Sequence, residues 1–165
     1  MSPCTHDVDR PQVTLDRAGE IDSLYRSEGE RLWRAVYAFA RDRDITSDAV
    51  AEAFAQCLGR GDAVRSPKAW VWRTAFRIAS GELQRRGRFS ELTTEPSYDL
   101  AEQDDDLMAA LASLPDNQRA ALVLRYYAGY DAKGIADILG CATATVRVHL
   151  SRGRKRMETV LGRTR

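Results

Sequence analysis

The chain has 165 residues, of which 44% are apolar and 30% are charged. That length has room for one ordinary domain or two very small ones, so it excludes a large multidomain enzyme, and the apolar share excludes a chain that is disordered throughout. No stretch approaches the roughly 20 apolar residues needed to cross a bilayer, and Asp7, Asp9 and Arg10 stand where a signal peptide would need an apolar run. We therefore expect a folded, cytoplasmic protein without membrane insertion.

The net charge of +1 conceals a division along the chain. Residues 1–116 hold 15 Lys and Arg against 21 Asp and Glu, a balance of −6, whereas residues 117–165 hold 10 against 3, a balance of +7. A basic block on a short segment suggests a polyanionic partner, with a solvated helix surface as the alternative. The acidic remainder argues against a protein that merely coats nucleic acid.

Helical periodicity dominates the first half of the chain. After a mobile tail expected over residues 1–20, apolar residues recur at spacings of three and four from Ile21 to Ala40 and predict an amphipathic helix. A second helix is expected to start at the N-cap residue types of 46–48 and to end at Gly59. Ser66-Pro67 predicts the start of a third helix, because proline suits the first helical position, and this helix should run to about Arg86.

A domain boundary follows the third helix. Residues 89–104 are rich in Ser, Thr, Glu, Pro and Asp without a period, and predict a flexible acidic linker. Short helices are then expected over residues 107–114, 116–129, 131–139 and from Thr143 onward, with Asp116 and Asp131 as caps. No segment alternates with period two for long enough to form a strand. The prediction is an all-α fold, in which two small helical domains, residues 21–88 and 105–162, are joined by the linker.

The last two helices and the turn at Gly140 between them predict a helix-turn-helix. A helix fits the major groove of DNA, where its first residues reach base edges and its guanidinium groups pair with guanine or phosphate. The candidates for base readout are Thr143, Thr145, Arg147, Val148 and His149. Ser151 shares the basic face, and the candidates for phosphate contact are Arg152, Arg154, Lys155 and Arg156. A corner of a helical bundle stays open as the alternative for the motif, and a hydrogen-bonded surface group for His149.

Two blocks of residues resemble a known family. Leu114-Pro115, Gln118-Arg119, Ile138-Leu139-Gly140 and Thr145-Val146-Arg147 resemble region four of a bacterial RNA polymerase sigma factor. Upstream, Asp48-Ala49-Val50 with Glu52 and Phe54, followed by Pro67-Lys68-Ala69-Trp70-Val71 with Arg73, resemble region two. The order of the blocks, joined by a short linker, is similar to that of the extracytoplasmic function (ECF) group. The resemblance covers about residues 21–161.

The resemblance implies a non-catalytic subunit that binds core RNA polymerase, places it on promoter DNA and helps to open the duplex. It implies that Asp48, Glu52 and Phe54 dock on the coiled coil of the polymerase β′ subunit, and that the C-terminal domain meets the β flap. It also implies contact with single-stranded DNA, for which the candidates are Lys68, Trp70, Arg73 and Arg77. An anti-sigma protein is a further implied partner. From the residues alone, Trp70 and Trp72 could both be core residues, and Arg73 and Arg77 could simply be solvated.

The sequence departs from the family pattern at several positions. Ala51 replaces the usual glutamine of the docking helix, and Arg77 and Gly81 replace asparagine and aspartate in the third helix. In the helix-turn-helix, Gly134 stands where glutamate is usual, and serine, glycine and arginine are replaced by Ala142, Ala144 and His149. The resemblance therefore does not extend to the bases of the promoter.

Two rival functions compete with this interpretation. A stand-alone helix-turn-helix regulator would bind duplex DNA without polymerase, but it leaves the acidic docking helix and the Trp/Arg helix unexplained. An enzyme would need a positioned nucleophile or a metal cluster, and the two histidines, His6 and His149, fall in the expected tail and the expected recognition helix. The three cysteines, Cys4, Cys57 and Cys141, have no paired spacing. We therefore expect no catalytic residue, metal or cofactor.

Overall fold

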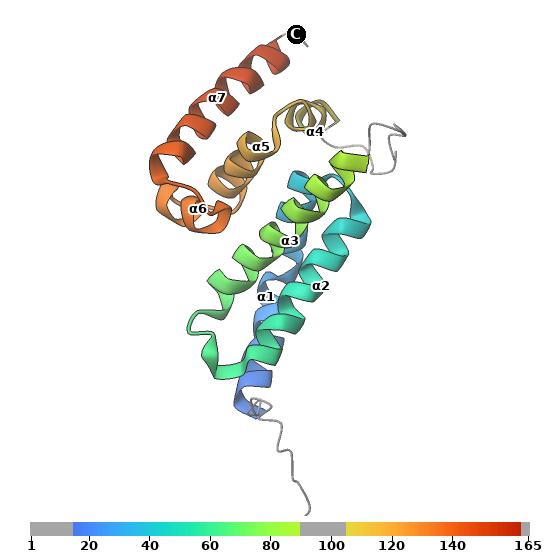
Figure 1. The fold of residues 1–165 in the computed structure, drawn as a ribbon, viewed down its shortest axis with the longest axis vertical. Helices are drawn as coiled ribbons and strands as arrows, with labels where there is room; N and C mark the ends of the chain where they lie inside the picture. Colours follow the sequence, from blue (N-terminus) through green and yellow to red (C-terminus); the bar gives the residue numbers. More distant parts are fainter. Residues whose placement is uncertain (1–14, 90–104, 163–165) are drawn as a thin grey trace, which may run out of the picture.

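The computed structural model describes residues 15–89 and 105–162, and within these ranges all regular structure is helical (Figure 1). The elements in chain order are α1 (Leu15–Ala40), α2 (Arg43–Arg60), the short 3-10 turn η1 (Gly61–Ala63), α3 (Pro67–Phe89), α4 (Asp105–Ala112), α5 (Asp116–Leu122), the π-helical turn η2 (Val123–Tyr127), α6 (Ala132–Leu139) and α7 (Thr143–Gly162). The predicted all-α fold class is confirmed. Over the same ranges, no helix combines the length and the apolar character that crossing a membrane requires.

The first three helices form a bundle around large apolar side chains. Leu32 and Phe39 of α1 and Trp72 and Phe76 of α3 are almost wholly buried, and the rings of Phe39 and Phe76 stack with centroids 5.4 Å apart. Because such side chains recur at helical spacing on each helix, each helix buries one stripe against the other two.

The first helix begins earlier than the sequence pattern predicts. The expected mobile tail reaches residue 20, but α1 starts at Leu15, and residues 1–14 lie outside the described residues. Arg17 forms an ion pair with Glu20 within the first turns and donates a hydrogen bond to the carbonyl oxygen of Val64. This long-range contact anchors the start of α1, and a local periodicity cannot reveal it.

The break between α1 and α2 is also sharper than expected. Arg41 has a positive φ of 56°, and Asp42 caps α2, its carboxylate accepting a hydrogen bond from the backbone N–H of Ile45 at 2.9 Å. The N-cap predicted at residues 46–48 is therefore wrong, and Thr46 is instead a buried residue whose hydroxyl donates to the carbonyl oxygen of Asp42. Both Asp42 and the predicted residues are good capping types, so spacing alone could not choose between them.

The third helix runs three residues past its predicted end, from Pro67 to Phe89. Residue 89 of the predicted flexible linker belongs to this helix, and the rest of the linker, residues 90–104, lies outside the described residues. On the far side of this gap, α4 begins at Asp105.

The C-terminal helices pack around a small leucine cluster. Leu111, Leu114 and Leu122 are buried together, and α7 crosses them at Gly153, where an added Cβ would lie 3.1 Å from Cδ1 of Leu122. Gly153 therefore permits a close approach of the α7 backbone to α5, which holds α7 in place at its middle.

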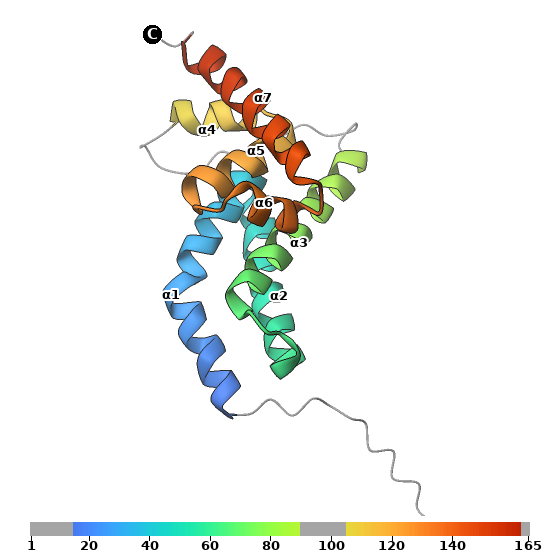
Figure 2. The same ribbon diagram turned by 90° about the vertical axis from the view of Figure 1, so that its left-hand side faces the viewer.

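The two halves of the molecule are packed against each other rather than separate (Figure 2). The buried residues of α1–α3 continue into those of α5, η2, α6 and α7 as one apolar cluster. Buried Arg119 of α5 donates to the carbonyl oxygen of Phe39 at 2.6 Å, and Arg31 of α1 donates to the carbonyl oxygen of Ala128 at 2.8 Å. The helix-turn-helix thus rests directly on the N-terminal bundle.

Candidate nucleic-acid and polymerase interface

The helix-turn-helix is built by two local signals. Asp131 caps α6, and its carboxylate accepts a hydrogen bond from the backbone N–H of Gly134 at 2.7 Å. Gly140 ends α6 in the left-handed conformation, with φ of 67°, and α7 starts three residues later at Thr143. A left-handed residue at this position satisfies the last carbonyls of a helix and turns the chain, which is why glycine is favoured there. These two residues fix the angle at which α7 leaves the turn.

The outer face of α7 carries the predicted duplex-contacting residues. Val146 and Gly153 are the buried residues of α7 and face the core. The opposite face of the helix points away from the core. Thr143 and His149 are half-buried, and the exposed residues are Thr145, Arg147, Val148, Ser151, Arg152, Arg154, Lys155 and Arg156. Within residues 15–89 and 105–162, no ion pair uses a cation of α7. The face is therefore available to an external anion.

A hollow beside α7 adds two cations that the sequence analysis did not select. Arg125 of η2 and Lys133 of α6 line a depression of about 540 Å³ together with Arg147 and Arg154. Arg125 is held there by a hydrogen bond of 3.2 Å to the carbonyl oxygen of Tyr130. These residues belong to different helices, so no periodicity joins them. The depression is suited to an anionic oxygen such as a DNA phosphate.

The predicted single-strand site lies along α3. Lys68 is paired with Glu28 of α1 at 2.8 Å, and Trp70 is half-buried with the guanidinium of Arg60 5.7 Å from its ring centroid. Arg73 is half-buried and Arg77 is exposed. The neighbouring Trp72 is fully buried and belongs to the core, whereas Trp70 sits at the core's rim, so one of the two tryptophans could meet a base.

Glu28 is the acid that holds Lys68. Burial raises the pKa of this carboxyl, but the hydrogen bond and charge of Lys68, together with the charge of Arg31, lower it to a net value below the ordinary one. Arg31 lies 3.5 Å from the other carboxylate oxygen. Glu28 is therefore a carboxylate under ordinary conditions, and it competes with any other anion for Lys68.

The predicted docking face on α2 loses one of its members. Asp48 and Glu52 are exposed, and Glu52 accepts a hydrogen bond from Gln56 at 2.7 Å. Phe54 is only 6% exposed and packs edge-on against the ring of Tyr25, with centroids 5.1 Å apart. The expectation that Phe54 contacts a partner is corrected, because its side chain points into the bundle and Tyr25, which is 55% exposed, covers it.

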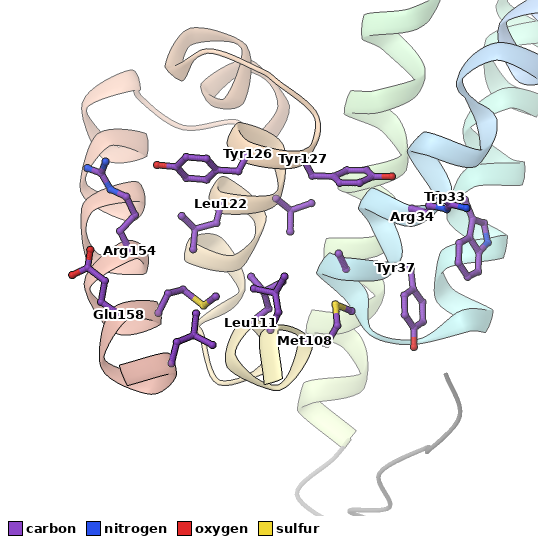
Figure 3. Close-up of a pocket in the computed structure, with 15 residues that line it drawn as sticks. Trp33, Arg34, Tyr37, Met108, Leu111, Leu122, Tyr126, Tyr127, Arg154 and Glu158 are labelled. Atoms are coloured by element: carbon purple, nitrogen blue, oxygen red, sulfur yellow. The ribbon is translucent and has the colours of Figure 1, made fainter. Parts of the chain in front are cut away.

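An apolar groove of about 830 Å³ runs between α1, α4, η2 and α7 (Figure 3). Trp33 and Tyr37 of α1 stack on each other with centroids 5.2 Å apart on one side of it, and Met108 and Leu111 lie between them and α7. Tyr126, 64% exposed, lines the groove from η2. The described residues contain no group of three His, Cys, Asp or Glu side chains that could hold a metal.

Comparison with known proteins gives matches to both halves. Residues 104–157 match the family described as Sigma-70, region 4. The chain is 27% identical over 138 residues to RNA polymerase sigma factor SigV of Bacillus subtilis, covering 78% of this chain and 83% of that one. It is 28% identical over 159 residues to ECF RNA polymerase sigma factor SigE of Mycolicibacterium smegmatis, covering 86% of this chain and 62% of that one.

Solved structures show the same fold. The sigma factor RpoE of Bartonella quintana, solved in complex with the anti-sigma factor NepR, matches with a TM-score of 0.74 and 22% identity over 91% of this chain and 99% of that one. CnrH, solved in complex with the cytosolic domain of CnrY, matches with a TM-score of 0.65 and 18% identity over 88% of this chain and 89% of that one. Each match spans both helical halves.

Proposed function

We propose that the chain is a sigma factor similar to those of the ECF group, and that it binds core RNA polymerase and directs it to a promoter. Sigma factors are non-enzymatic transcription factors. In this proposal the polymerase supplies the chemistry, and this chain supplies the choice of start site. The two halves, residues 21–88 and 105–162, take separate roles.

The observation that carries the proposal is the exposed basic face of α7 on a correctly capped helix-turn-helix. Asp131 and Gly140 set the turn, and Arg147, Arg152 and Lys155 extend outward from α7. We assign base contacts to the first turns of α7 and phosphate contacts to its later turns, because the N-terminal end of a recognition helix reaches deepest into the major groove. Arg125 and Lys133 join the phosphate contacts.

The N-terminal half is proposed to hold the melted strand and the polymerase. A base stacking on Trp70, with Arg60, Lys68 and Arg77 near the backbone, would use the aromatic and cationic contacts that single strands favour. The acidic pair Asp48 and Glu52 on α2 is proposed to meet the coiled coil of the β′ subunit, and the C-terminal half the β flap.

An anti-sigma protein is proposed as a further partner. The two solved neighbours were captured with the anti-sigma factor NepR and with the cytosolic domain of CnrY. The groove lined by Trp33, Tyr37 and Tyr126 supports the proposal, because an exposed apolar surface of this kind is typical of a protein-binding site.

The test is to mix the chain with sigma-free core polymerase, measure co-elution and map the transcripts that the mixture starts on genomic DNA. The proposal expects co-elution and discrete start sites. The charge reversals Asp48→Arg and Glu52→Lys should together reduce co-elution, whereas Asp106→Lys, a reversal at another exposed aspartate, on α4, should not. Duplex binding by the chain alone, without co-elution, would instead favour the stand-alone regulator.

A second variant tests the DNA half. Arg147→Ala should reduce promoter-directed transcription and leave co-elution unchanged, because Arg147 lies on α7, far along the chain from the acidic face of α2. Equal transcription by the variant and the parent chain would refute the assignment of Arg147.

A further inference from the structure

Within the part of the chain that the structure describes, Val148 is the one large apolar side chain of α7 that is exposed. Val148 is 45% exposed, whereas Leu150 and Met157 on the same helix are partly buried against the leucine cluster. Apolar side chains stabilise a fold by leaving water, and Val148 does so only in part. Packing within the chain therefore does not account for a valine at this position.

Val148 lies on the side of α7 that faces away from the core. With 3.6 residues per turn, a residue two positions from buried Val146 points to the other side of the helix. Ala144 and Ser151, four residues before and three residues after Val148, share that side and are exposed. The helix itself lies at an edge of the molecule, packed against α4, α5 and α6 (Figure 1). The outer line of the N-terminal half of α7 is therefore uncharged.

Cations stand on both sides of this outer line. Arg147 and Arg154 follow one side and line the cationic depression beside α7. Arg152 and Arg156 are exposed and follow the other side. A helix that enters the major groove has a phosphate backbone on either side of it. The flanking cations are therefore placed for phosphates, and the uncharged line between them is placed for base edges.

A valine side chain can recognise one feature of a base pair. Its methyl groups neither donate nor accept a hydrogen bond, so they do not read the polar atoms of the bases. The apolar group that base pairs present in the major groove is the C5 methyl group of thymine. Contact between these apolar groups removes both of them from water, which is favourable.

We propose that Val148 reads a thymine in the DNA element bound by α7, by packing against the C5 methyl group of that base. Ala144 and Ser151 are short side chains on the same line, and they let the helix come close enough for this contact. That the element belongs to a promoter rests on the proposed function, whereas the thymine contact requires only that α7 enters the major groove.

The test replaces thymine by deoxyuridine, which lacks the methyl group and keeps the O4 acceptor. A duplex is first selected from a random library, once by the full-length chain on core polymerase and once by the full-length chain alone. Each thymine of the selected duplex is then replaced in turn, and affinity is measured by fluorescence anisotropy. At one thymine we expect the parent chain to bind about fourfold more weakly after replacement, which corresponds to one buried methyl group.

Three variants show whether that loss depends on Val148. Val148→Ala should bind the thymine and deoxyuridine duplexes equally, and Val148→Ile should keep the fourfold difference. Thr159→Ala is the matched control, because Thr159 is an exposed β-branched residue on the same side of α7, about three turns further along. It should discriminate as the parent chain does, and circular dichroism checks that each variant is folded. No loss at any thymine, or the same loss in Val148→Ala, would overturn the thymine contact.

The two selections separate this contact from the proposed function. If the chain does not bind core polymerase but selects a duplex alone and discriminates through Val148, the proposed function is wrong and the thymine contact is supported. If the chain binds polymerase and no replacement matters, the thymine contact alone is wrong. If neither selection enriches a sequence, α7 reads no base, and the thymine contact is overturned.

Discussion

The salt dependence of duplex binding tests the basic face of α7 one cation at a time. Arg147, Arg152, Arg154, Lys155 and Arg156 are exposed and make no ion pair within residues 15–89 and 105–162. Each cation that neutralises a phosphate adds about −0.9 to the slope of log K against log salt concentration, so all of them together would contribute about −4.5. Lys155→Ala should bring that contribution to about −3.6.

The difference is large enough to measure. Across a fourfold rise in salt concentration, a slope of about −4.5 predicts a loss of affinity of about 500-fold, and a slope of about −3.6 predicts a loss of about 150-fold. The assay is fluorescence anisotropy of a labelled promoter duplex with the chain assembled on core polymerase, so that the polymerase's own contribution cancels between variants.

Arg26→Ala is the control, because Arg26 is an exposed arginine on α1 that pairs with Asp22 at 3.0 Å. Its slope should equal that of the parent chain. The reasoning is refuted if Lys155→Ala leaves the slope unchanged, or if Arg26→Ala changes it by the same amount.

Three further predictions concern stability. Arg119→Met leaves the buried carbonyl oxygens of Phe39 and Leu114 without their hydrogen-bond donor, which should lower the free energy of unfolding by about 1.5 kcal/mol for each and Tm by about 6–12 °C in a thermal melt. A fall in Tm no larger than that of the exposed Arg34→Met would contradict this prediction. Asp42→Ala should lower the free energy of unfolding by about 1 kcal/mol more than Asp42→Asn, which keeps an N-cap side chain. Equal melting temperatures of the two variants would exclude a stabilising role for this cap. Burial raises the pKa of Glu28, but Lys68 and Arg31 lower it to a net value below the ordinary one. The ion pairs of Glu28 therefore stabilise the fold above about pH 4.3, and this stabilisation is lost as the pH falls through the lower pKa of the folded state. Glu28→Gln should reduce the fall of Tm at acidic pH.

Features carried by neighbouring residues could be predicted from the sequence. The spacing of apolar residues indicated the amphipathic helices, and Asp131 and Gly140 indicated where α6 begins and ends. The basic face of α7 follows from the same logic, because residues three and four apart share one side of a helix. The helix-turn-helix was therefore predictable down to its caps.

The side chain of Phe54 shows where that logic stops. Its place in the sequence fits both a docking face and a core stripe, and its burial is decided by Tyr25, which lies on another helix. The depression that joins Arg125 and Lys133 to α7 is similar, since its residues come from three helices. Neither feature has a local signal.

The sequence by itself determined the helices, their order and the basic face of α7, because turn residues and helical periodicity depend only on residues a few positions apart. Only the tertiary structure decided that Tyr130 meets Trp72, that Arg119 reaches Phe39 and that Glu28 holds Lys68. Those contacts join residues 40 or more positions apart. They depend on how whole helices pack, and packing is settled by the summed burial of many side chains rather than by any short pattern.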